Sequence, residues 1–265
     1  MTTKEIERKS NIKEDRHFVT ALSRGLDVLA CFRSGQKLLG NMEISKRCNL
    51  PKSTVSRLTY TLTKLGYLTY LEEFGKYRLG SATLSLGSSM LSNSDVRSIA
   101  RPLMQELADF SQSMVSLASP DRLSMIYIEN ARSSSALTLA LDVGSKIPLA
   151  TSAIGRAYLA GISEQDRGAF YKLLETQDPK TAPKLILGIE KAMKQYQELG
   201  CTCSFGDWQK DVNAIAIPVK QGGGMLPMAI NCGGPAFNLS PDFLLDKIRP
   251  KLLELGRKLA TQGWK

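Results

Sequence analysis

The sequence predicts an α+β protein in which a helical N-terminal part with a β-hairpin precedes a larger part of mixed helices and strands. Apolar residues recur at helical spacing in three segments between residues 20 and 65. Two short strand-like runs, 67–71 and 76–79, follow on either side of a turn. From residue 114 onward, apolar runs alternate with amphipathic segments, which is typical of an α/β domain. The 265 residues suffice for one large core or two modest ones.

The N-terminal part is expected to contain three helices. The first covers Thr20–Phe32, and the second covers Asn41–Cys48 with Asn41 as its expected N-cap. The third covers Lys52–Leu65. Pro51 favours a turn at the residues before it, and proline suits the first position of a helix or the position just before it. The expected apolar faces comprise Leu22, Leu26, Val28, Leu29, Ala30 and Phe32 on the first helix, and Val55, Leu58, Leu62 and Leu65 on the third.

This order of elements, helix, helix, turn, helix and hairpin, predicts a winged helix-turn-helix that reads the major groove of double-stranded DNA. The third helix would enter the groove, because its exposed faces carry hydroxyls and cations that can contact phosphates and base edges. The hairpin would touch the flanking backbone. The candidate DNA contacts are Lys52, Ser53, Thr54, Ser56 and Arg57 on the third helix, Lys76 and Arg78 in the hairpin, and Arg24 and Lys46 near helix N-termini.

The charge distribution supports this interpretation. The net charge is +10, and most of the excess lies in residues 1–87, where 15 Lys and Arg face 8 Asp and Glu. A basic segment attracts polyanions and supplies phosphate contacts. A solubilising surface or a protein-binding winged domain remains an alternative, because neither charge nor helix order by itself excludes them.

The remaining chain divides into a linker helix and a mixed domain. Residues 1–17 are expected to be a disordered tail, 18–80 the winged domain, 81–93 a linker helix and 94–265 the α/β domain. Expected helices of the last domain cover 96–111, 152–161, 163–175, 184–199 and a C-terminal segment from Ser240. Expected strands cover 114–119, 123–129, 137–141, 201–205, 212–219 and 225–232, the last two joined by a turn at Gln221–Gly224.

Composition argues against a metal site, a cofactor and catalysis. The five cysteines, Cys31, Cys48, Cys201, Cys203 and Cys232, are scattered, which fits a reducing compartment rather than a disulfide framework. The sole histidine, His17, lies in the polar tail, so neither a zinc site nor a histidine-based triad is expected. The chain has no phosphate loop, no nucleophile elbow and no span of about 20 apolar residues. Residues 1–16 are polar and lack the apolar stretch of a secretory signal, so no such signal is expected. A cytoplasmic protein without membrane contact is expected.

Several motifs resemble the IclR family of bacterial regulators over about residues 18–262. The N-terminal motifs are specific and the C-terminal ones are looser. They are Ser23–Leu29, Leu50–Leu58, Leu65–Leu68 and Tyr77–Gly80, followed by Pro148–Ala157, Ile215–Val219 and Gly233–Phe237. The resemblance implies a GAF-like α/β effector domain, and assembly as a homodimer or homotetramer on palindromic promoter sites. It also implies a response to a small organic acid or aromatic metabolite.

The resemblance further implies an effector pocket between the central sheet and the start of the helix at residue 152. Matching positions give Ala153, Ile154, Ser204, Ala214, Asn231 and Gly233 as candidate effector contacts. In the family's glyoxylate-type members, the positions that match the last four of these residues look like an aspartate, a cysteine and two serines. This chain departs from that pattern at all four positions, so the resemblance does not imply glyoxylate as its effector. Ser204 and Asn231 can donate hydrogen bonds to a carboxylate. Trp208 is interpreted first as a packing residue, and second as an apolar wall for a ring.

Two alternatives stand beside a ligand-responsive regulator. The first is an architectural DNA binder whose C-terminal domain only oligomerises. The second is a metabolite-binding protein or enzyme with a vestigial winged domain, against which the missing catalytic constellation counts.

Overall fold

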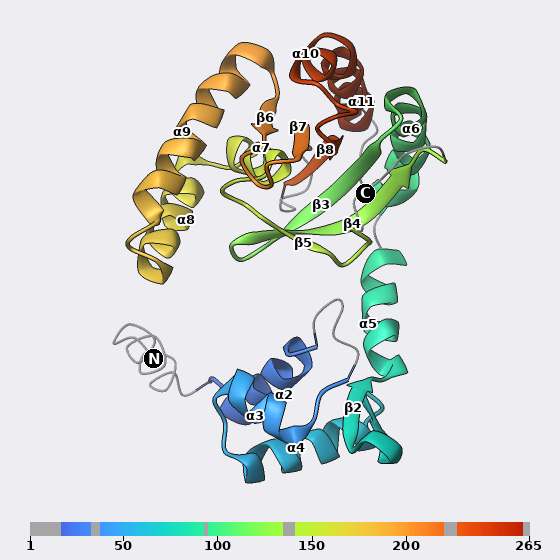
Figure 1. Cartoon of the computed structure of the whole chain (residues 1–265), viewed down its shortest axis with the longest axis vertical. Helices are drawn as coiled ribbons and strands as arrows, with labels where there is room; N and C mark the ends of the chain where they lie inside the picture. The colour runs from blue at the N-terminus through green and yellow to red at the C-terminus, as the bar shows by residue number, and fades with distance from the viewer. Residues whose placement is uncertain (1–16, 33–37, 93–94, 135–140, 220–226, 262–265) are drawn as a thin grey trace. The chain divides into compact units, whose positions relative to one another are not determined.

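The computed structural model describes residues 17–32, 38–92, 95–134, 141–219 and 227–261. The chain divides into two compact units, Met1–Asn93 and Ser94–Lys265 (Figure 1). Three expected segments lie wholly or mostly outside the described residues. The turn expected at Gln221–Gly224 lies wholly outside them, and the tail and the strand expected at 137–141 each keep one described residue, 17 and 141. No helix in the described part is both long and apolar enough to cross a membrane.

The first unit is a winged helix-turn-helix. Its elements are α2 (Thr20–Ala30), α3 (Asn41–Cys48), α4 (Lys52–Lys64), β1 (Leu68–Leu71), a 3-10 turn (Glu72–Phe74), β2 (Lys76–Leu79) and α5 (Ser81–Ser92). β1 and β2 pair in antiparallel register from Leu68 opposite Leu79 to Leu71 opposite Lys76. Leu39 adds a bridge to Tyr77 and ties the segment before α3 to the hairpin. The core comprises Val28, Cys31, Leu39, Ile44, Val55 and Leu68.

The start of α3 differs from the sequence-based expectation. Gly40, not Asn41, is the N-cap, and the Glu43 carboxylate accepts a hydrogen bond from the Gly40 N–H at 2.7 Å. This is the reciprocal half of a capping box, and it releases the Asn41 side chain for tertiary contacts. At the other end, Asn49 adopts a left-handed conformation with φ of 52°, which ends α3 before the turn into α4.

The apolar face of α2 is narrower than predicted. Val28 is buried, but Leu22 and Leu26 are 63% and 57% exposed. Helical periodicity shows which residues share a face, yet it does not show how far the neighbouring helices extend over that face. In this unit, α3 and α4 cover only the C-terminal end of α2, where Val28 and Cys31 enter the core.

The second unit is built on an antiparallel sheet. In the described part, six strands lie in the order β5-β4-β3-β8-β7-β6. They are β3 (Met114–Asp121), β4 (Ser124–Arg132), β5 (Lys146–Pro148), β6 (Thr202–Phe205), β7 (Val212–Val219) and β8 (Met228–Pro235). The helices are α6 (Asp95–Ser111), α7 (Ala153–Gly161), α8 (Glu164–Gln177), α9 (Ala182–Leu199), α10 (Pro241–Phe243) and α11 (Arg249–Thr261), with a π-helical turn over Leu244–Ile248. The three-residue strand β5 was not predicted.

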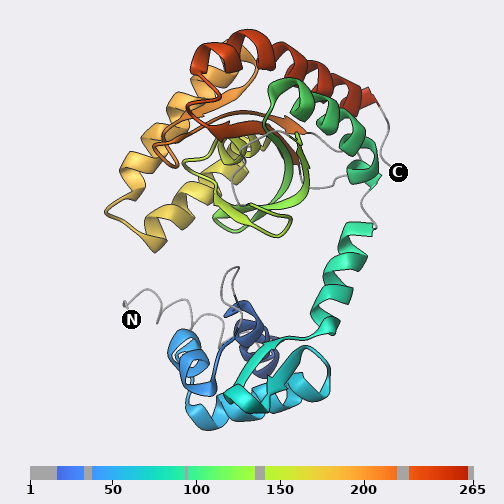
Figure 2. The same cartoon turned by 45° about the vertical axis from the view of Figure 1, so that its right-hand side comes forward.

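The two faces of this sheet are covered by different helices (Figures 1 and 2). Ala214 and Ala216 point into the cluster that α7 closes, whereas Ile217 contacts Gly256 of α11. This division follows from the alternation of side chains along β7. α7 approaches closely because residue 155 is glycine, where a Cβ would lie 2.6 Å from the Leu149 carbonyl carbon and closer still to its oxygen. The start of α7 is thereby held against the segment at Leu149, which follows β5.

Candidate DNA-binding surface and ligand cavity

The exposed side of α4 forms one continuous stripe. Val55 and Thr59 are buried against the rest of the first unit, so residues at the complementary helical positions face solvent. The exposed stripe comprises Lys52, Ser53, Ser56, Arg57, Tyr60, Thr61 and Lys64. Four of the five predicted contacts on this helix lie in it, and Thr54 is half-buried at its edge. The stripe presents two hydroxyls and two cations in the first turns of the helix.

Tyr60 was not predicted as part of this surface. Its ring is 65% exposed, and the Lys64 ammonium lies 5.6 Å from the ring centroid. The signal was present in the sequence, because Tyr60 follows Ser53 and Ser56 at helical spacing. The apolar character of tyrosine concealed it, since such residues are first assigned to a core.

The angle of α4 depends on a buried threonine. Thr59 is fully buried, and its hydroxyl lies 3.1 Å from the Asn41 Oδ1 and 3.0 Å from the Val55 carbonyl oxygen. Asn41 also donates through Nδ2 to the Ser56 hydroxyl at 3.3 Å. These bonds join the N-terminus of α3 to the middle of α4, so they set the angle between the two helices of the motif.

The remaining predicted DNA contacts lie on the surface of the first unit. Arg24 on α2, Lys46 on α3 and Arg78 on β2 are exposed. Lys76 differs, because its ammonium lies 3.4 Å from the Glu43 carboxylate that caps α3. Both side chains of this ion pair are about half exposed, so the pair contributes little to stability and Lys76 stays able to reach a phosphate.

The second unit contains a small cavity between α7 and the sheet. All six predicted effector residues, Ala153, Ile154, Ser204, Ala214, Asn231 and Gly233, line it, together with Met114, Tyr127, Ile147, Ser152, Trp208 and Val212. Its free volume is about 10 Å³, which is room for about one water molecule. Apolar side chains dominate the wall, and Trp208 is half-buried against the same core. Any larger ligand therefore requires the wall to move.

Asn231 and Tyr127 are two of the polar residues that line the cavity. Asn231 is 4% exposed, and its Oδ1 has no hydrogen-bond partner among the described residues. Burial raises the pKa of the Tyr127 hydroxyl to about 12, although the adjacent Asn231 and Ser116 side chains lower it. Tyr127 is therefore neutral at physiological pH. A buried amide oxygen without a partner is costly, and it favours a ligand or water that donates a hydrogen bond.

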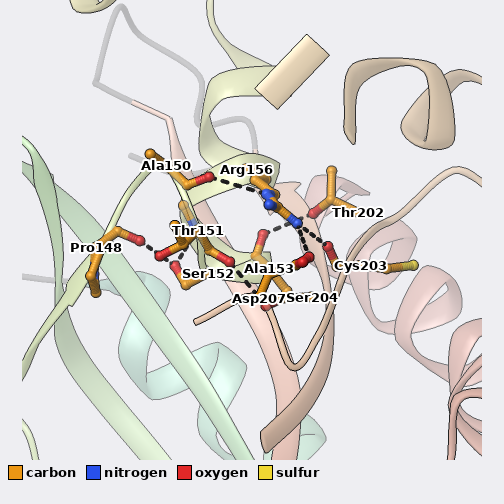
Figure 3. Close-up of polar contacts among 11 residues, drawn as sticks. Pro148, Ala150, Thr151, Ser152, Ala153, Arg156, Thr202, Cys203, Ser204 and Asp207 are labelled. Carbon is orange, nitrogen blue, oxygen red and sulfur yellow. Dashed lines mark hydrogen bonds and ion pairs between the residues drawn. The ribbon is translucent and has the colours of Figure 1, made fainter. Parts of the chain in front are cut away.

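Ser204 plays a different part from the one predicted. Its hydroxyl donates to the Thr151 carbonyl oxygen at 2.9 Å, so its proton is not available to a carboxylate in this arrangement (Figure 3). Ser204 instead ties β6 to the segment that precedes α7. The hydroxyl of Ser152 caps that helix by accepting a hydrogen bond from the Gly155 N–H at 3.2 Å.

Arg156 on α7 was missed in the sequence, and it joins α7 to β6 and to the loop after β6 (Figure 3). Its Nε donates to the Ala150 carbonyl oxygen at 3.1 Å, and one terminal nitrogen donates to Cys203 O at 2.9 Å and to Asp207 Oδ2 at 2.6 Å. The Arg156 side chain is 9% exposed and that of Asp207 is 49% exposed. Because Asp207 precedes Trp208, this ion pair couples α7 to the loop that carries a wall residue.

Gly233 and Ala214 both line the cavity and leave little room between them. They face each other on β8 and β7, and a Cβ at Gly233 would lie 2.7 Å from the Ala214 Cβ. A serine at 233 beside a cysteine at 214, as in the glyoxylate-type pattern, would not fit this strand spacing without a shift. The departure from that pattern is therefore a matter of shape as well as polarity.

Two domain models, both from IclR regulators, match the chain. The IclR helix-turn-helix domain matches residues 21–72, which contain β1 and most of the helical part of the first unit. The bacterial transcriptional regulator IclR C-terminal domain matches residues 88–261, which contain the whole sheet. Between the two matches lie residues 73–87, which contain β2 and the first half of α5. Together the matches account for most of the described residues.

Relatives and solved structures agree with these matches. The HTH-type transcriptional regulator TsaQ1/TsaQ2 of Comamonas testosteroni is 31% identical over 246 residues, which are 92% of this chain and 88% of that protein. A crystal structure of an IclR family transcriptional regulator from Brucella abortus is 41% identical, covers 94% of each chain and has a TM-score of 0.84. An IclR homolog from Microbacterium hydrocarbonoxydans, solved in complex with 4-hydroxybenzoate, shares the fold at 20% identity, with a TM-score of 0.72 over 91% of this chain and 98% of that one. The chain therefore belongs to the IclR family of bacterial transcriptional regulators, which are DNA-binding proteins and not enzymes.

Proposed function

We propose that this regulator binds double-stranded promoter DNA through α4 and the wing, and that an effector in the cavity changes its DNA affinity. The proposal assigns DNA recognition to residues 18–80, coupling to 81–93 and effector binding to 94–265. The proposed DNA contacts are the nine predicted residues and Tyr60. As a regulator of bacterial promoters, the protein would act in the cytoplasm.

The observation that carries the effector proposal is the Oδ1 of Asn231, which is buried and has no hydrogen-bond partner among the residues that the structure describes. A buried acceptor on a residue that lines a mostly apolar cavity would select a ligand that presents a hydroxyl or N–H donor. Met114, Ile147 and Trp208 supply apolar surface for the body of such a ligand. Among small organic acids and aromatic metabolites, these features favour an aromatic compound with a ring hydroxyl. The IclR homolog bound to 4-hydroxybenzoate shows that a relative accepts a ligand of this kind.

Signal transfer would follow from the small size of the cavity. A ring does not fit into about 10 Å³, so binding displaces the wall, and the loop with Trp208 is the most exposed part of that wall. Displacement of this loop pulls on Asp207 and hence on Arg156 in α7. The effector thereby shifts the population between two arrangements of the second unit by its difference in affinity for them.

The paired probes 4-hydroxybenzoate and benzoate test this proposal on the full chain. The hydroxy compound is expected to raise the melting temperature and to change the affinity for DNA from the region upstream of the gene, measured by fluorescence anisotropy. Benzoate lacks the ring hydroxyl, so a smaller shift is expected. Ligand at 100 times Kd would stabilise the protein by about 2.7 kcal/mol. An unchanged DNA affinity at saturating ligand would favour the architectural alternative.

The variant Asn231→Leu provides the control for this experiment. Leucine keeps the approximate volume and removes the acceptor, but it also removes the hydrogen bond between Asn231 and the Tyr127 hydroxyl, so the unliganded variant should lose about 1 to 3 kcal/mol of stability and stay folded. The preference for 4-hydroxybenzoate over benzoate should disappear in the variant. A preserved preference would remove Asn231 from the recognition site.

Assembly as a dimer on a palindromic site is proposed from exposed apolar side chains of the first unit. Leu22 and Leu26 on α2 are 63% and 57% exposed. The helix α5 contains no charged residue, and it exposes the apolar side chains of Leu84, Leu86 and Met90. Side chains of this kind on two helices of one unit are typical of a surface covered by a second copy. Each arm of a palindrome then receives one α4, with tetramers forming from two such dimers.

The double variant Leu22→Glu, Leu26→Glu is expected to halve the assembly mass measured by sedimentation. It should also weaken binding to the full palindrome about tenfold or more, because each protomer then pairs with its half-site independently. The fold should persist, since both leucines are exposed in the single chain. The matched control is Leu187→Glu on α9, where the leucine is 58% exposed. An unchanged mass in the double variant would place the dimer contact elsewhere.

A further inference from the structure

Two cysteines from different helices meet in the DNA-binding unit. Cys31 follows the last residue of α2, and Cys48 is the last residue of α3. Their Sγ atoms lie 3.0 Å apart, and both cysteines are free thiols. A disulfide has an S–S length of about 2.05 Å, so an approach of about 1 Å separates this contact from a covalent bond. The helix ends already hold the two side chains in facing positions.

The surroundings keep the pair together and leave one sulfur within reach of solvent. Arg47 donates from its guanidinium to the Cys31 carbonyl oxygen at 2.9 Å, which links the ends of α2 and α3. The Cys48 thiol also lies 3.6 Å from the Asp27 carbonyl oxygen, at an exposed position. Cys31 is 7% exposed, whereas Cys48 is half-buried. Cys48 is therefore the thiol that a small oxidant meets first.

We propose that Cys31 and Cys48 form a reversible disulfide when the protein meets a peroxide, and that this bond weakens DNA binding. The Cys48 thiolate attacks one peroxide oxygen, the O–O bond breaks, and the product is a sulfenic acid with release of one water after protonation. The Cys31 sulfur then attacks the Cys48 sulfur, displaces its hydroxyl group and loses its own proton, which yields the disulfide and a second water. In balance, two thiols are oxidised to one disulfide and one peroxide is reduced to two waters.

The expected effect on DNA binding follows from the position of Cys48. It precedes the turn Asn49–Pro51, and α4 begins at the next residue. Two bonds make the turn stiff, since the Leu50 N–H donates to the Ser45 carbonyl oxygen at 3.1 Å and the Ser45 hydroxyl donates to the Leu50 carbonyl oxygen at 2.6 Å. If the disulfide draws Cys48 toward α2, the segment Asn49–Pro51 moves as a rigid unit. The N-terminal residues of α4, which carry proposed base contacts, are then displaced with it.

The rate of this reaction is expected to depend steeply on pH. Burial raises the pKa of Cys48 to about 12, with further increases from the neighbouring Cys31 and Asp27, while Arg47 lowers it. At neutral pH the thiol is almost entirely protonated, and its thiolate fraction rises about tenfold per pH unit. The pair therefore resists traces of peroxide and responds to sustained oxidation. Cytosolic disulfides of this transient kind are known as redox-sensing devices.

The test oxidises the full chain with hydrogen peroxide, maps disulfides by mass spectrometry of peptides, and measures DNA affinity before oxidation, after oxidation and after dithiothreitol. A peptide pair joining Cys31 to Cys48 is expected, with affinity about tenfold weaker, the loss expected when a base contact is broken, and recovery on reduction. The linkage should form about ten times faster for each added pH unit.

The variants Cys31→Ala and Cys48→Ala separate this mechanism from other oxidation. Each keeps one thiol of the pair and all three cysteines of the second unit, so reduced variants should bind DNA like the parent and keep that affinity after peroxide. Two results would overturn the proposal: no peptide joining Cys31 to Cys48, or an oxidised, linked protein that binds DNA as tightly as the reduced one. Because the linkage is read by mass alone, it is judged separately from DNA recognition and from the effector cavity.

Discussion

Replacing Gly155 with alanine is expected to lower the free energy of unfolding of the second unit by about 3 kcal/mol or more. The added Cβ would lie 2.6 Å from the Leu149 carbonyl carbon and nearer still to its oxygen, and these are backbone atoms that no side-chain rotation relieves. Relief requires the start of α7 and the segment at Leu149, which follows β5, to move apart. Because Ala153 and Ile154 at the start of α7 line the cavity, the ligand response should be lost with the stability.

Chemical unfolding followed by circular dichroism measures this loss, and Gly168→Ala is the matched control. Gly168 lies within α8, where an added Cβ would meet no other atom within 4 Å. Alanine there should stabilise the helix by up to about 1 kcal/mol, since alanine has the higher helix propensity. The two substitutions add the same methyl group in helices of the same unit, so opposite signs isolate the contact with Leu149. Equal effects would mean that α7 has room to adjust.

Replacing Arg57 with alanine is expected to weaken DNA binding about 10- to 100-fold, the effect of losing one arginine that contacts a base edge. Arg57 is exposed on the stripe of α4, and in the described part no ion pair engages its guanidinium. The dependence of affinity on salt should also become shallower, by about one unit in the slope, if Arg57 releases a counterion on binding. Stability should not change, because the side chain faces solvent.

Fluorescence anisotropy with upstream DNA over a range of salt concentrations measures both quantities. Arg57→Lys keeps the positive charge but loses the planar guanidinium that can donate two parallel hydrogen bonds to a base. It should therefore restore the dependence of affinity on salt and leave the affinity for the specific site low. Arg101→Ala removes the same charge from an exposed position on α6 in the second unit and should change neither quantity by much. If Arg57→Ala and Arg101→Ala behave alike, the recognition surface does not include Arg57.

The helices and the wing of the first unit were predictable because they depend on local chemistry. Pro51 is the N-cap of α4, Gly66 follows its end, and the strands at 68–71 and 76–79 are short runs on either side of a turn. The errors concern neighbours that local patterns do not contain. Asn41 was expected to cap α3, but Gly40 does so because Glu43 reaches back to its N–H. Leu22 and Leu26 were expected in the core, and no other element of the described unit covers them.

For the cavity, the resemblance to a family supplied the six positions that gather around it, and the tertiary structure supplied what they do there. Ser204 was expected to donate to a ligand, and its proton instead reaches the Thr151 carbonyl oxygen. Tyr127 and Arg156 were missed, since a tyrosine in a strand and an arginine in a helix carry no local sign of their partners. Trp208 was interpreted mainly as packing, and it both packs on the core and lines the cavity.

The sequence by itself determined the order of helices and hairpin in the first unit, the mixed helices and strands of the second, and the family. Periodicity, turn residues and charge act over a few residues, and they are written directly in the chain. Only the tertiary structure decided that the Asn231 oxygen is buried without a hydrogen-bond partner in the described part of the chain, that Arg156 joins α7 to Asp207, and that Cys31 meets Cys48. Each of these depends on segments far apart in sequence arriving within a few ångströms of each other. Such distances follow from the packing of whole elements, which no local pattern records.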